Sequence, residues 1–402
     1  MRAEIFPSKA SGEITAPPSK SVAHRAIICA CLADGESKIS NIEYSQDILA
    51  TVDCMRALGA EINANDDSLT VKGPVSKHKC AVLGCRESGS TLRFIIPLAL
   101  LICEDCSFAL SGRLAERPLG VYEKLFAENG ISMERNADGL KIRGSLKPGI
   151  FTVEGGVSSQ FISGLLFALP LLGGGSEIRI IPPIESRPYI DMTLSALKRF
   201  GVAVQFSDKN IIRVKGDSRY RPCDINIEGD WSNAAFFEAL NFSGGSVKIN
   251  GLDPESAQGD RICTELFRKL KGENSEIDLS DCPDLGPVMM ACAYLNGAVF
   301  TGVSRLRLKE SDRCGAMALE LSKFGIKTQQ TENTFTVYKS RLQKPSQPLD
   351  SHNDHRIAMA MSVLCAQTGG VIEGVQAVGK SFPSFFDKLK STGIKVILNE
   401  TS

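Results

Sequence analysis

The chain has 402 residues, which is long enough to bury two substantial hydrophobic cores. Hydrophobic residues make up 43% of it and charged residues 23%, and 46 lysines and arginines balance 46 aspartates and glutamates. This balance argues against a nucleic-acid coat or a membrane-surface protein, so an anion-binding site must come from a local cluster of cations.

The cysteines and the N-terminal residues give two further expectations. The 13 cysteines are scattered and there are only four histidines, so we expect no structural zinc site. The first residues lack the apolar stretch of a secretory signal, and no uncharged apolar run approaches the length of a membrane span. We therefore expect a cytoplasmic protein with reduced thiols and with no nucleic-acid or membrane partner.

Amphipathic helical segments recur along the chain, and each ends at a glycine. The segments are 47–58, 121–129, 190–200, 265–271, 316–324 and 385–392, and they end at Gly59, Gly130, Gly201, Gly272, Gly325 and Gly393. The intervals between successive glycines are nearly equal, except that the interval from Gly272 to Gly325 is shorter. After most of these glycines, two β-like stretches surround a polar turn, which predicts a hairpin.

A second set of helical segments is apolar on nearly every side, which is typical of buried helices. These segments begin near Ser21, Ser90, Ser159, Ser232, Asp284 and Asp354, again at nearly equal intervals, with a shorter one from Ser232 to Asp284. Together the two sets predict six copies of one α/β unit, made of a buried helix, a strand, an amphipathic helix and two strands.

Six such units are too many to pack around a single hydrophobic core, so we expect two similar domains. Each would hold three repeats of a βαβαββ-type unit around its buried helices. The shortened interval just after the midpoint indicates a change of domain there. We place one domain at 19–228 and the second at 1–18 with 229–402, and we expect the active site in the cleft between them.

The predicted buried helices begin with polar or charged residues, and helix N-termini attract anions. Serine and aspartate at these starts are also explained by N-capping alone. Capping does not explain Lys20, Arg25, Arg93 and Arg356, because cations in a first turn oppose the helix dipole. These cations predict a ligand whose negative charge outweighs that cost.

The segment 305–313 (RLRLKESDR) carries many charges between a predicted strand and a predicted helix. Ser311 is the expected N-cap of that helix, which puts Glu310 just before the helix and Arg313 in its first turn. Asp284 and Glu310 each lie near a helix start among cations, as expected of a general acid/base pair. The alternatives are a solvated charge run and, for Asp284, a simple N-cap.

The segment 374–381 (GVQAVGKS) matches the P-loop pattern GxxxxGK[ST], which taken alone favours a nucleotide-binding protein. The helix of a P-loop begins at its lysine, whereas Phe382 and Pro383 follow closely on Lys380 here. Proline moves the expected helix start a few residues onward, so we do not expect P-loop geometry. Lys380 remains a candidate ligand for a phosphate or a carboxylate.

Nine short motifs, taken with the six repeats, resemble the enolpyruvyl transferase family over essentially the whole chain. They are 18–25 (PSKSVAHR), 87–93 (ESGSTLR), 116–118 (ERP), 158–161 (SSQF), 186–189 (SRPY), 283–284 (PD), 308–313 (LKESDR), 354–356 (DHR) and 380–383 (KSFP). The resemblance implies an inside-out α/β barrel in each domain. It also implies a monomeric transferase acting on phosphoenolpyruvate and shikimate 3-phosphate, without metal or organic cofactor. That reaction belongs to the shikimate pathway, which leads to chorismate and the aromatic amino acids and is the target of glyphosate.

The resemblance also implies the ligands of both substrates. Those for shikimate 3-phosphate are Lys20, Ser21, Arg25, Ser158, Ser159, Gln160, Ser186, Tyr189, Asp284, Arg305 and Lys309. Those for phosphoenolpyruvate are Lys20, Gly89, Arg117, Gln160, Arg313, Arg356 and Lys380. In the implied reaction the enolpyruvyl group moves to the 5-hydroxyl through a tetrahedral adduct. We assign Glu310 as the acid toward carbon and Asp284 as the base toward the hydroxyl, with Lys20 assisting.

Departures from the family pattern bear on the substrate. Glu87 and Arg305 stand where many members have asparagine, and Arg305 is expected to add a contact to shikimate 3-phosphate. Gly89 predicts room for glyphosate. The sister enzymes that act on UDP-N-acetylglucosamine typically carry a reactive cysteine five residues before the arginine that matches Arg117, where this chain has Gly112. That difference favours the shikimate substrate over this first alternative. A P-loop nucleotide-binding protein and a non-catalytic anion-binding relative are the others.

Overall fold

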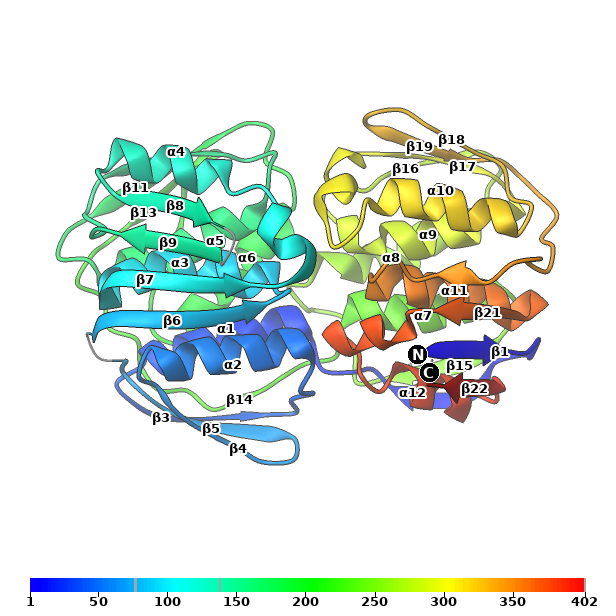
Figure 1. Cartoon of the computed structure of the whole chain (residues 1–402), viewed down its shortest axis with the longest axis horizontal. Helices are drawn as coiled ribbons and strands as arrows, with labels where there is room; N and C mark the ends of the chain where they lie inside the picture. The colour runs from blue at the N-terminus through cyan, green and yellow to red at the C-terminus, as the bar shows by residue number, and fades with distance from the viewer. Residues whose placement is uncertain (76–77, 137–138, 401–402) are drawn as a thin grey trace. The chain divides into compact units, whose positions relative to one another are not determined.

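The computed structural model describes residues 1–75, 78–136 and 139–400. The chain divides into two compact units (Figure 1). Unit 1 comprises Met1–Pro17 and Gly229–Ser402, and unit 2 comprises Pro18–Glu228. Each unit has its own hydrophobic core, in which helices pack against β-sheets. The α/β class predicted from the sequence is confirmed.

The sheets of unit 2 share one topology, in which a parallel pair of strands is followed by two antiparallel neighbours. In order across each sheet the strands are β14 (Ile225–Asn226), β3 (Gly35–Ser40), β5 (Ser68–Gly73) and β4 (Glu61–Ala64); β6 (His78–Arg86), β7 (Cys103–Leu110), β9 (Gly139–Arg143) and β8 (Ser132–Asn136); and β10 (Ile150–Glu154), β11 (Ser176–Ile181), β13 (Ile211–Val214) and β12 (Gln205–Asp208). The antiparallel pairs β4–β5 and β12–β13 are hairpins that the sequence predicts after Gly59 and Gly201.

Two sheets of unit 1 repeat this topology, and a third is a parallel pair. The strands are β16 (Ser275–Asp278), β17 (Ala298–Thr301), β19 (Thr334–Val337) and β18 (Thr328–Gln330); β20 (Leu349–Asp350), β21 (Gly370–Glu373), β1 (Arg2–Ile5) and β22 (Val396–Asn399); and β15 (Ser246–Asn250) with β2 (Ser11–Thr15). The N-terminal strand β1 lies between β21 and β22 and pairs with both in antiparallel register.

The helices predicted to be buried are buried. They are α1 (Lys20–Leu32), α3 (Gly89–Ile102), α5 (Ser159–Ala168), α7 (Trp231–Phe242), α9 (Gly286–Cys292) and α11 (His355–Thr368), with α5 and α9 continuing into the 3-10 turns η2 (Leu169–Leu171) and η5 (Ala293–Leu295). Five of the six begin at a side-chain N-cap that accepts a backbone N–H: Ser19, Ser88, Ser158, Asp230 and Asp354. The sixth helix, α9, has no such cap.

The amphipathic helices also form where the sequence predicts them. They are α2 (Gln46–Ala57), α4 (Gly120–Glu128), α6 (Arg187–Arg199), α8 (Cys263–Lys269, preceded by the 3-10 turn η3, Gly259–Ile262), α10 (Arg313–Lys323) and α12 (Phe385–Ser391). Five of the glycines that follow them have positive φ, between 69° and 94°, and Gly272 does not. A glycine adopts this left-handed conformation at no steric cost, whereas a residue with a Cβ atom is strained there. This difference is why a glycine so regularly follows these helices in the sequence.

Cysteines and surface charge agree with the composition. The described cysteines are free thiols. Cys103 and Cys106 stand at C-x-x-C spacing on β7, where residues three apart point to opposite faces, and burial raises the pKa of the Cys106 thiol to about 12.

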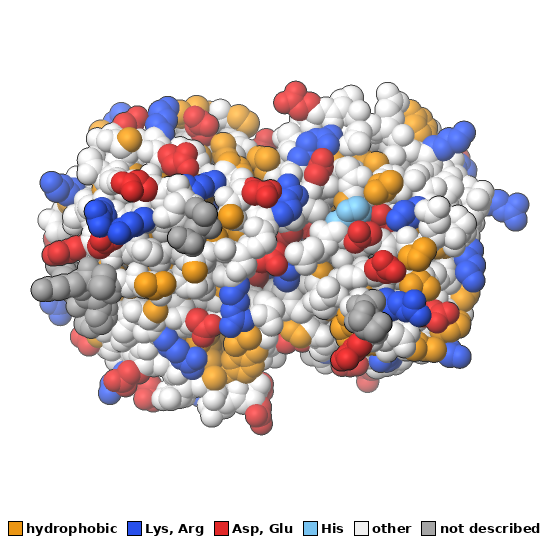
Figure 2. Space-filling view, viewed as in Figure 1, with side chains coloured by type: hydrophobic (Ala, Val, Ile, Leu, Met, Phe, Trp, Pro, Cys, Tyr) orange, Lys and Arg blue, Asp and Glu red, His pale blue; other side chains and the backbone are white. Residues whose placement is uncertain are grey.

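Figure 2 shows lysine and arginine side chains interspersed with aspartate and glutamate on the face that it displays. Within the described residues, the helices are too short or too polar to cross a membrane.

Candidate functional site

In unit 2, the start of α1 presents Lys20, Ser21 and Arg25. Lys20 Nζ lies 2.7 Å from Asp47 Oδ2 on α2. Arg25 is 3% exposed and donates to Thr193 Oγ1 (2.9 Å), to the Tyr189 carbonyl (2.9 Å) and to the Ser21 carbonyl (2.7 Å). The predicted ligands Ser21, Arg25 and Tyr189 therefore lie together, although Tyr189 is 164 residues beyond Arg25.

The charge of Arg25 has no carboxylate partner among the described residues. Its contacts are neutral oxygens and the face of Phe94, whose ring centroid is 5.1 Å from the guanidinium carbon. Burial lowers the pKa of Arg25 to about 10, because the charged form has lost its water. A buried cation without a counter-ion is an unfavourable arrangement that an anionic ligand would relieve.

The starts of α3 and α5 form a second cationic cluster in unit 2. Arg93 is 3% exposed and donates to Gln160 Oε1 (3.1 Å) and to the Pro118 carbonyl (3.1 Å), and Gln160 donates to Ser90 Oγ (2.9 Å). Burial lowers the pKa of Arg93, and the neighbouring charge of Arg117 lowers it further. Arg93 thus lies beside Gln160, and Arg117 is close enough for the two guanidinium charges to repel each other.

Gly89 lies against these two arginines. A Cβ atom at this position would overlap Arg117 Nη1 and would lie 2.8 Å from Arg93 Nη1. The absence of a side chain therefore lets both guanidinium groups approach the first turn of α3. Sequence reasoning included Gly89, Gln160 and Arg117 among the predicted ligands of phosphoenolpyruvate, and the structure brings these three residues together within unit 2.

The remaining predicted residues of unit 2 lie at two other helix starts. Ser158 caps α5, and Ser159 is the first residue of that helix. Ser186 precedes α6 with a left-handed φ of 55°, and Tyr189 lies in the first turn of α6. The helices α5 and α6 pack together, and Ser163 of α5 and Arg25 of α1 both form hydrogen bonds with Thr193 of α6.

In unit 1, Asp284 is surrounded by three cations. Its Oδ1 atom accepts from Arg313 Nη1 at 3.0 Å and lies 3.6 Å from Lys309 Nζ, and its Oδ2 atom accepts from Arg356 Nη2 at 3.0 Å. Asp284 lies inside the 3-10 turn η4 (Pro283–Leu285), ahead of α9, and does not cap that helix. Of the two interpretations open from the sequence, the N-cap is therefore wrong.

Glu310 is paired with a histidine that sequence reasoning did not assign a role. Glu310 Oε2 lies 2.8 Å from His355 Nδ1, and the His355 side chain is 1% exposed. A buried imidazole on a carboxylate can hold or release a proton at that carboxylate. The motif 354–356 (DHR), at the start of a predicted buried helix, is the signal that could have drawn attention to His355.

Asp354 binds Arg313, and both side chains are at most 2% exposed. Arg313 Nε donates to Asp354 Oδ2 at 2.8 Å. Burial acts to raise the pKa of Asp354, but the charge and hydrogen bonds of Arg313, together with His355, hold that pKa below its ordinary value. The predicted cap Ser311 is wrong by one residue: Asp312 caps α10 through Gly315 N, and Ser311 donates to Asp354 Oδ2 instead.

Arg305 and Lys380 are both held by backbone carbonyls. Arg305 lies on the 3-10 turn η6 (Ser304–Leu308), is 7% exposed, and donates to the Ser280 carbonyl at 2.6 Å. Lys380 ends the 3-10 turn η7 (Val375–Lys380) and donates to the Asn353 carbonyl at 2.6 Å. The next helix, α12, begins only at Phe385, so P-loop geometry is not present, as the proline predicts.

Glu310, Asp354 and His355 also offer three atoms of the metal-ligand type within 4.8 Å of one another. However, both oxygens of Asp354 already accept hydrogen bonds, from Ser311 and Arg313 on one side and from the Arg356 backbone on the other. The fixed positive charge of Arg313 beside them opposes a second cation. The donor set does not favour a metal ion.

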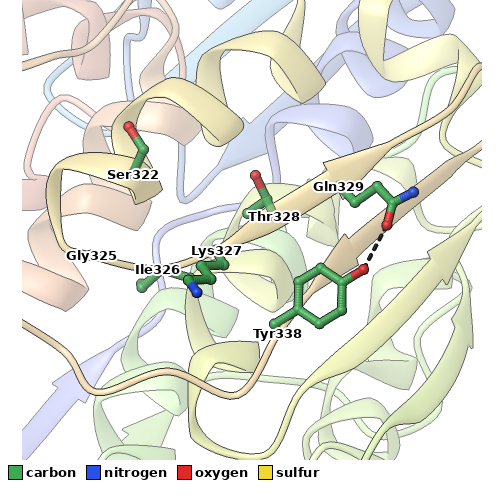
Figure 3. Close-up of a pocket in the computed structure, with 7 residues that line it drawn as sticks. All are labelled: Ser322, Gly325, Ile326, Lys327, Thr328, Gln329 and Tyr338. Carbon is green, nitrogen blue, oxygen red and sulfur yellow. Dashed lines mark hydrogen bonds between the residues drawn. The ribbon is translucent and has the colours of Figure 1, made fainter.

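A separate depression of about 640 Å³ lies between the end of α10 and the β18–β19 hairpin (Figure 3). It is lined by Ser322, Gly325, Ile326, Lys327, Thr328, Gln329 and Tyr338. Tyr338 donates to Gln329 Oε1 at 2.6 Å across its rim. None of the predicted site residues lines this depression.

Comparisons with known proteins agree with the motifs. The sequence profile of the family described as EPSP synthase (3-phosphoshikimate 1-carboxyvinyltransferase) matches residues 6–389. The 3-phosphoshikimate 1-carboxyvinyltransferase of Clostridium kluyveri is 40% identical over 412 residues, covering 97% of this chain and 96% of that protein. The enzyme of the same name from Clostridium botulinum strain Alaska E43 is 40% identical and is covered to 97%, as is this chain.

A solved structure of EPSP synthase from Acinetobacter baumannii superimposes with a TM-score of 0.78 at 23% identity, covering 99% of this chain and 100% of that one. At that identity the structural similarity shows the fold alone. Membership of the family is shown by the sequence profile and by the curated relatives. The chain belongs to the EPSP synthase (3-phosphoshikimate 1-carboxyvinyltransferase) family.

Proposed function

We propose that this chain transfers the enolpyruvyl group of phosphoenolpyruvate to the 5-hydroxyl of shikimate 3-phosphate, which releases phosphate and forms 5-enolpyruvylshikimate 3-phosphate. Family membership supports this reaction. The observation that carries it is the environment of Asp284, a carboxylate held by Arg313, Arg356 and Lys309. Such a site can bind anions and still supply a base.

We propose that the substrate anions share these cations with Asp284. Arg313 and Arg356 would bind phosphoenolpyruvate, and Lys309 would bind shikimate 3-phosphate with Arg305. As the anions take up hydrogen bonds from the three cations, the Asp284 carboxylate becomes available to the 5-hydroxyl. Competition for the same donors thus couples substrate binding to activation of the base.

The proton movements then balance. Glu310 gives a proton to the methylene carbon of phosphoenolpyruvate while the 5-oxygen attacks the neighbouring carbon and Asp284 takes the hydroxyl proton. Collapse of the tetrahedral adduct breaks the carbon–oxygen bond to phosphate, a proton returns from the methyl carbon to Glu310, and Asp284 gives its proton to the departing phosphate. His355, 2.8 Å from Glu310, is placed to stabilise its ionised state between these steps.

Unit 2 would supply the other ligands of the same substrates. Arg25, Ser21, Ser158, Ser159, Ser186 and Tyr189 would hold shikimate 3-phosphate, Gly89 and Arg117 would hold phosphoenolpyruvate, and Lys20 and Gln160 would touch both. Each substrate thus has proposed ligands in both units. We therefore propose that the reaction takes place in a cleft between two domains, whose boundaries in the chain lie near residues 18 and 229. Water would be excluded there when both sets engage.

The finer architecture belongs to the same proposal. In the part of the chain that the structure describes, five four-stranded sheets of one topology and six buried helices support six repeats, three to a domain, arranged as an inside-out α/β barrel. We further propose a monomer of the cytoplasm that needs no metal or organic cofactor and binds no nucleic acid.

Phosphate release from phosphoenolpyruvate tests the function, with shikimate 3-phosphate or UDP-N-acetylglucosamine as the acceptor. The wild-type protein should release phosphate only with shikimate 3-phosphate. Glu310→Gln and Asp284→Asn should each lower kcat by about 10²- to 10⁴-fold, the usual contribution of a general acid or base. Release with the UDP-sugar alone would assign the chain to the sister reaction, and release with neither acceptor would leave an anion-binding protein.

A further inference from the structure

A buried carboxylate outside the proposed ligand set forms hydrogen bonds with the segment that leads into α11. Glu320 lies on α10, seven residues after Arg313 and therefore two turns along the same face of the helix. Arg313 binds Asp354 at one end of the segment 350–354. Glu320 Oε1 lies 2.9 Å from His352 Nε2, and Glu320 Oε2 accepts from the Asp350 backbone N–H at 3.0 Å, so α10 holds the other end as well.

The segment between these two attachment points has an unusual backbone. His352 and Asn353 both have left-handed conformations, with φ of 51° and 52°. Residues with a side chain rarely adopt this region, even though histidine and asparagine tolerate it better than most. Two such residues in succession need outside contacts to persist, and the Glu320 carboxylate supplies one through His352 and one through the Asp350 N–H.

The left-handed turn sets the direction of a carbonyl that the proposed site uses. The Asn353 carbonyl accepts from Lys380 Nζ at 2.6 Å, and the next residue, Asp354, caps α11 through the Arg356 N–H. A change at residues 352 and 353 would therefore move Lys380 and the first turn of α11 together.

We propose that Glu320 is a positioning residue, which acts through His352 and the backbone of 350–353 to fix Lys380 and Arg356 for phosphoenolpyruvate. This inference rests on the proposed function, in which Lys380 and Arg356 are ligands of that substrate. Glu320 is fully buried and contacts His352, Lys323 and the Asp350 backbone, none of which is in the proposed ligand set.

The test compares Glu320→Gln, which keeps the shape of the side chain but loses its charge, with Lys323→Met. Lys323 is the other cation on Glu320, at 2.9 Å, and it also donates to the Pro348 carbonyl at 3.0 Å; both Lys323 and that carbonyl lie outside the segment 350–354, so its replacement is a matched control. Glu320→Gln should raise KM for phosphoenolpyruvate about tenfold, the scale of a misplaced charged ligand, with kcat and KM for shikimate 3-phosphate nearly unchanged. Lys323→Met should leave all three constants close to those of the wild-type protein.

Amide hydrogen exchange of the same proteins, read for peptides covering 349–356, separates this inference from the proposed function. Glu320→Gln should speed exchange there and leave the α1 peptides unchanged. If the wild-type protein releases no phosphate, the proposed function fails and the inference fails with it, while faster exchange still shows that Glu320 holds the segment. An unchanged KM for phosphoenolpyruvate in an active, folded Glu320→Gln protein overturns the inference, as does an equal rise in Lys323→Met.

Glu320→Gln is a substitution at a buried position, so a second variant covers the case in which it does not fold. The His352 side chain is 26% exposed, so His352→Gln removes the imidazole partner of Glu320 without a substitution at a fully buried position. It should raise KM for phosphoenolpyruvate in the same direction and speed exchange in 349–356. A folded His352→Gln protein with wild-type values in both measurements overturns the inference.

Discussion

Gly89 and Arg117 lie so close together in unit 2 that a methyl group on Gly89 would overlap the Arg117 guanidinium. Arg93 approaches the same point, and its Nη1 would lie 2.8 Å from that methyl group. Gly89 therefore determines how closely two proposed anion-binding cations can approach the N-terminus of α3.

Gly89→Ala should raise KM for phosphoenolpyruvate on the order of tenfold, because Arg117 must move away from its position. Steady-state phosphate release at varied phosphoenolpyruvate measures this. Gly120→Ala is the matched control, since Gly120 is also the first residue of a helix and its added Cβ would lie 4.0 Å from its nearest neighbour, Glu123 Oε2. Equal KM values for the two variants would show that Arg117 does not depend on the space at Gly89.

Arg25→Met should separate function from stability. The variant removes a buried charge that has no carboxylate partner among the described residues, so the free energy of unfolding should stay unchanged or rise by up to about 2 kcal/mol. KM for shikimate 3-phosphate should rise about 10- to 100-fold, the value of a charged hydrogen bond to phosphate. Urea unfolding and steady-state kinetics give the two readouts.

Arg179→Met is the control for Arg25→Met, because Arg179 is 53% exposed and pairs with Glu177 on the surface of a sheet. Neither its kinetics nor its unfolding should change appreciably. A clear loss of stability in Arg25→Met would mean that its hydrogen bonds to Thr193 and to the Tyr189 carbonyl outweigh the cost of the buried charge.

Arg356→Lys should weaken binding of phosphoenolpyruvate although the charge is kept. Arg356 donates to Asp284 Oδ2, to the Asp284 carbonyl and to Ser232 Oγ, each at 3.0 Å, and an ammonium group cannot reproduce this fork. We expect KM for phosphoenolpyruvate to rise about tenfold or more. Arg143→Lys, at a surface pair with Asp105, should change nothing; similar KM values for both variants would remove Arg356 from the proposed site.

The His352–Glu320 pair should give unit 1 a pH-dependent stability. The hydrogen bond to Glu320 raises the pKa of His352 above its ordinary 6.5. The contribution of the protonated His352 to the free energy of unfolding is therefore complete below pH 6.5 and is lost as pH rises through the folded-state pKa. For Glu320, burial acts to raise the pKa, but hydrogen bonds from His352 and Lys323 hold it below its ordinary 4.5. That contribution is complete above pH 4.5 and is lost as pH falls through the folded-state pKa.

Both contributions are therefore complete between pH 4.5 and 6.5. In that window, wild-type protein should exceed His352→Gln in unfolding free energy by roughly 1 kcal/mol, the scale of a partly screened charged hydrogen bond. Urea titrations from acid to alkaline pH measure the difference, which should shrink on both sides. A difference independent of pH would show that His352 acts through packing and not through its charge.

Much of the fold could be predicted because its signals are local. A glycine with positive φ ends five of the amphipathic helices, and a serine or aspartate cap starts five of the buried ones. Such signals lie within a few residues of the structure they determine. Such a signal does not fix the first residue of a helix where two adjacent residues can both act as the N-cap. This is why the sequence indicates Ser311, whereas Asp312 caps α10.

The site was less predictable because its contacts join residues far apart in the chain. The motifs named Arg25, Asp284 and Glu310, but no pattern indicated that Arg25 would bind Thr193, 168 residues away, or that Glu310 would bind His355. Glu320 belongs to the amphipathic pattern of α10, and nothing in that pattern distinguishes a carboxylate that faces solvent from one that is fully buried.

The place of β1 in its sheet has a consequence for synthesis on the ribosome. β1 pairs with β21 and β22, which lie near the opposite end of the chain, whereas unit 2 is continuous from Pro18 to Glu228. Unit 2 can fold as soon as its last strand has emerged, while the segment Met1–Pro17, made before unit 2, must wait for the partner strands of β1, which are made after it. A strand that is made before unit 2 thus finds its partners only after unit 2 has been completed.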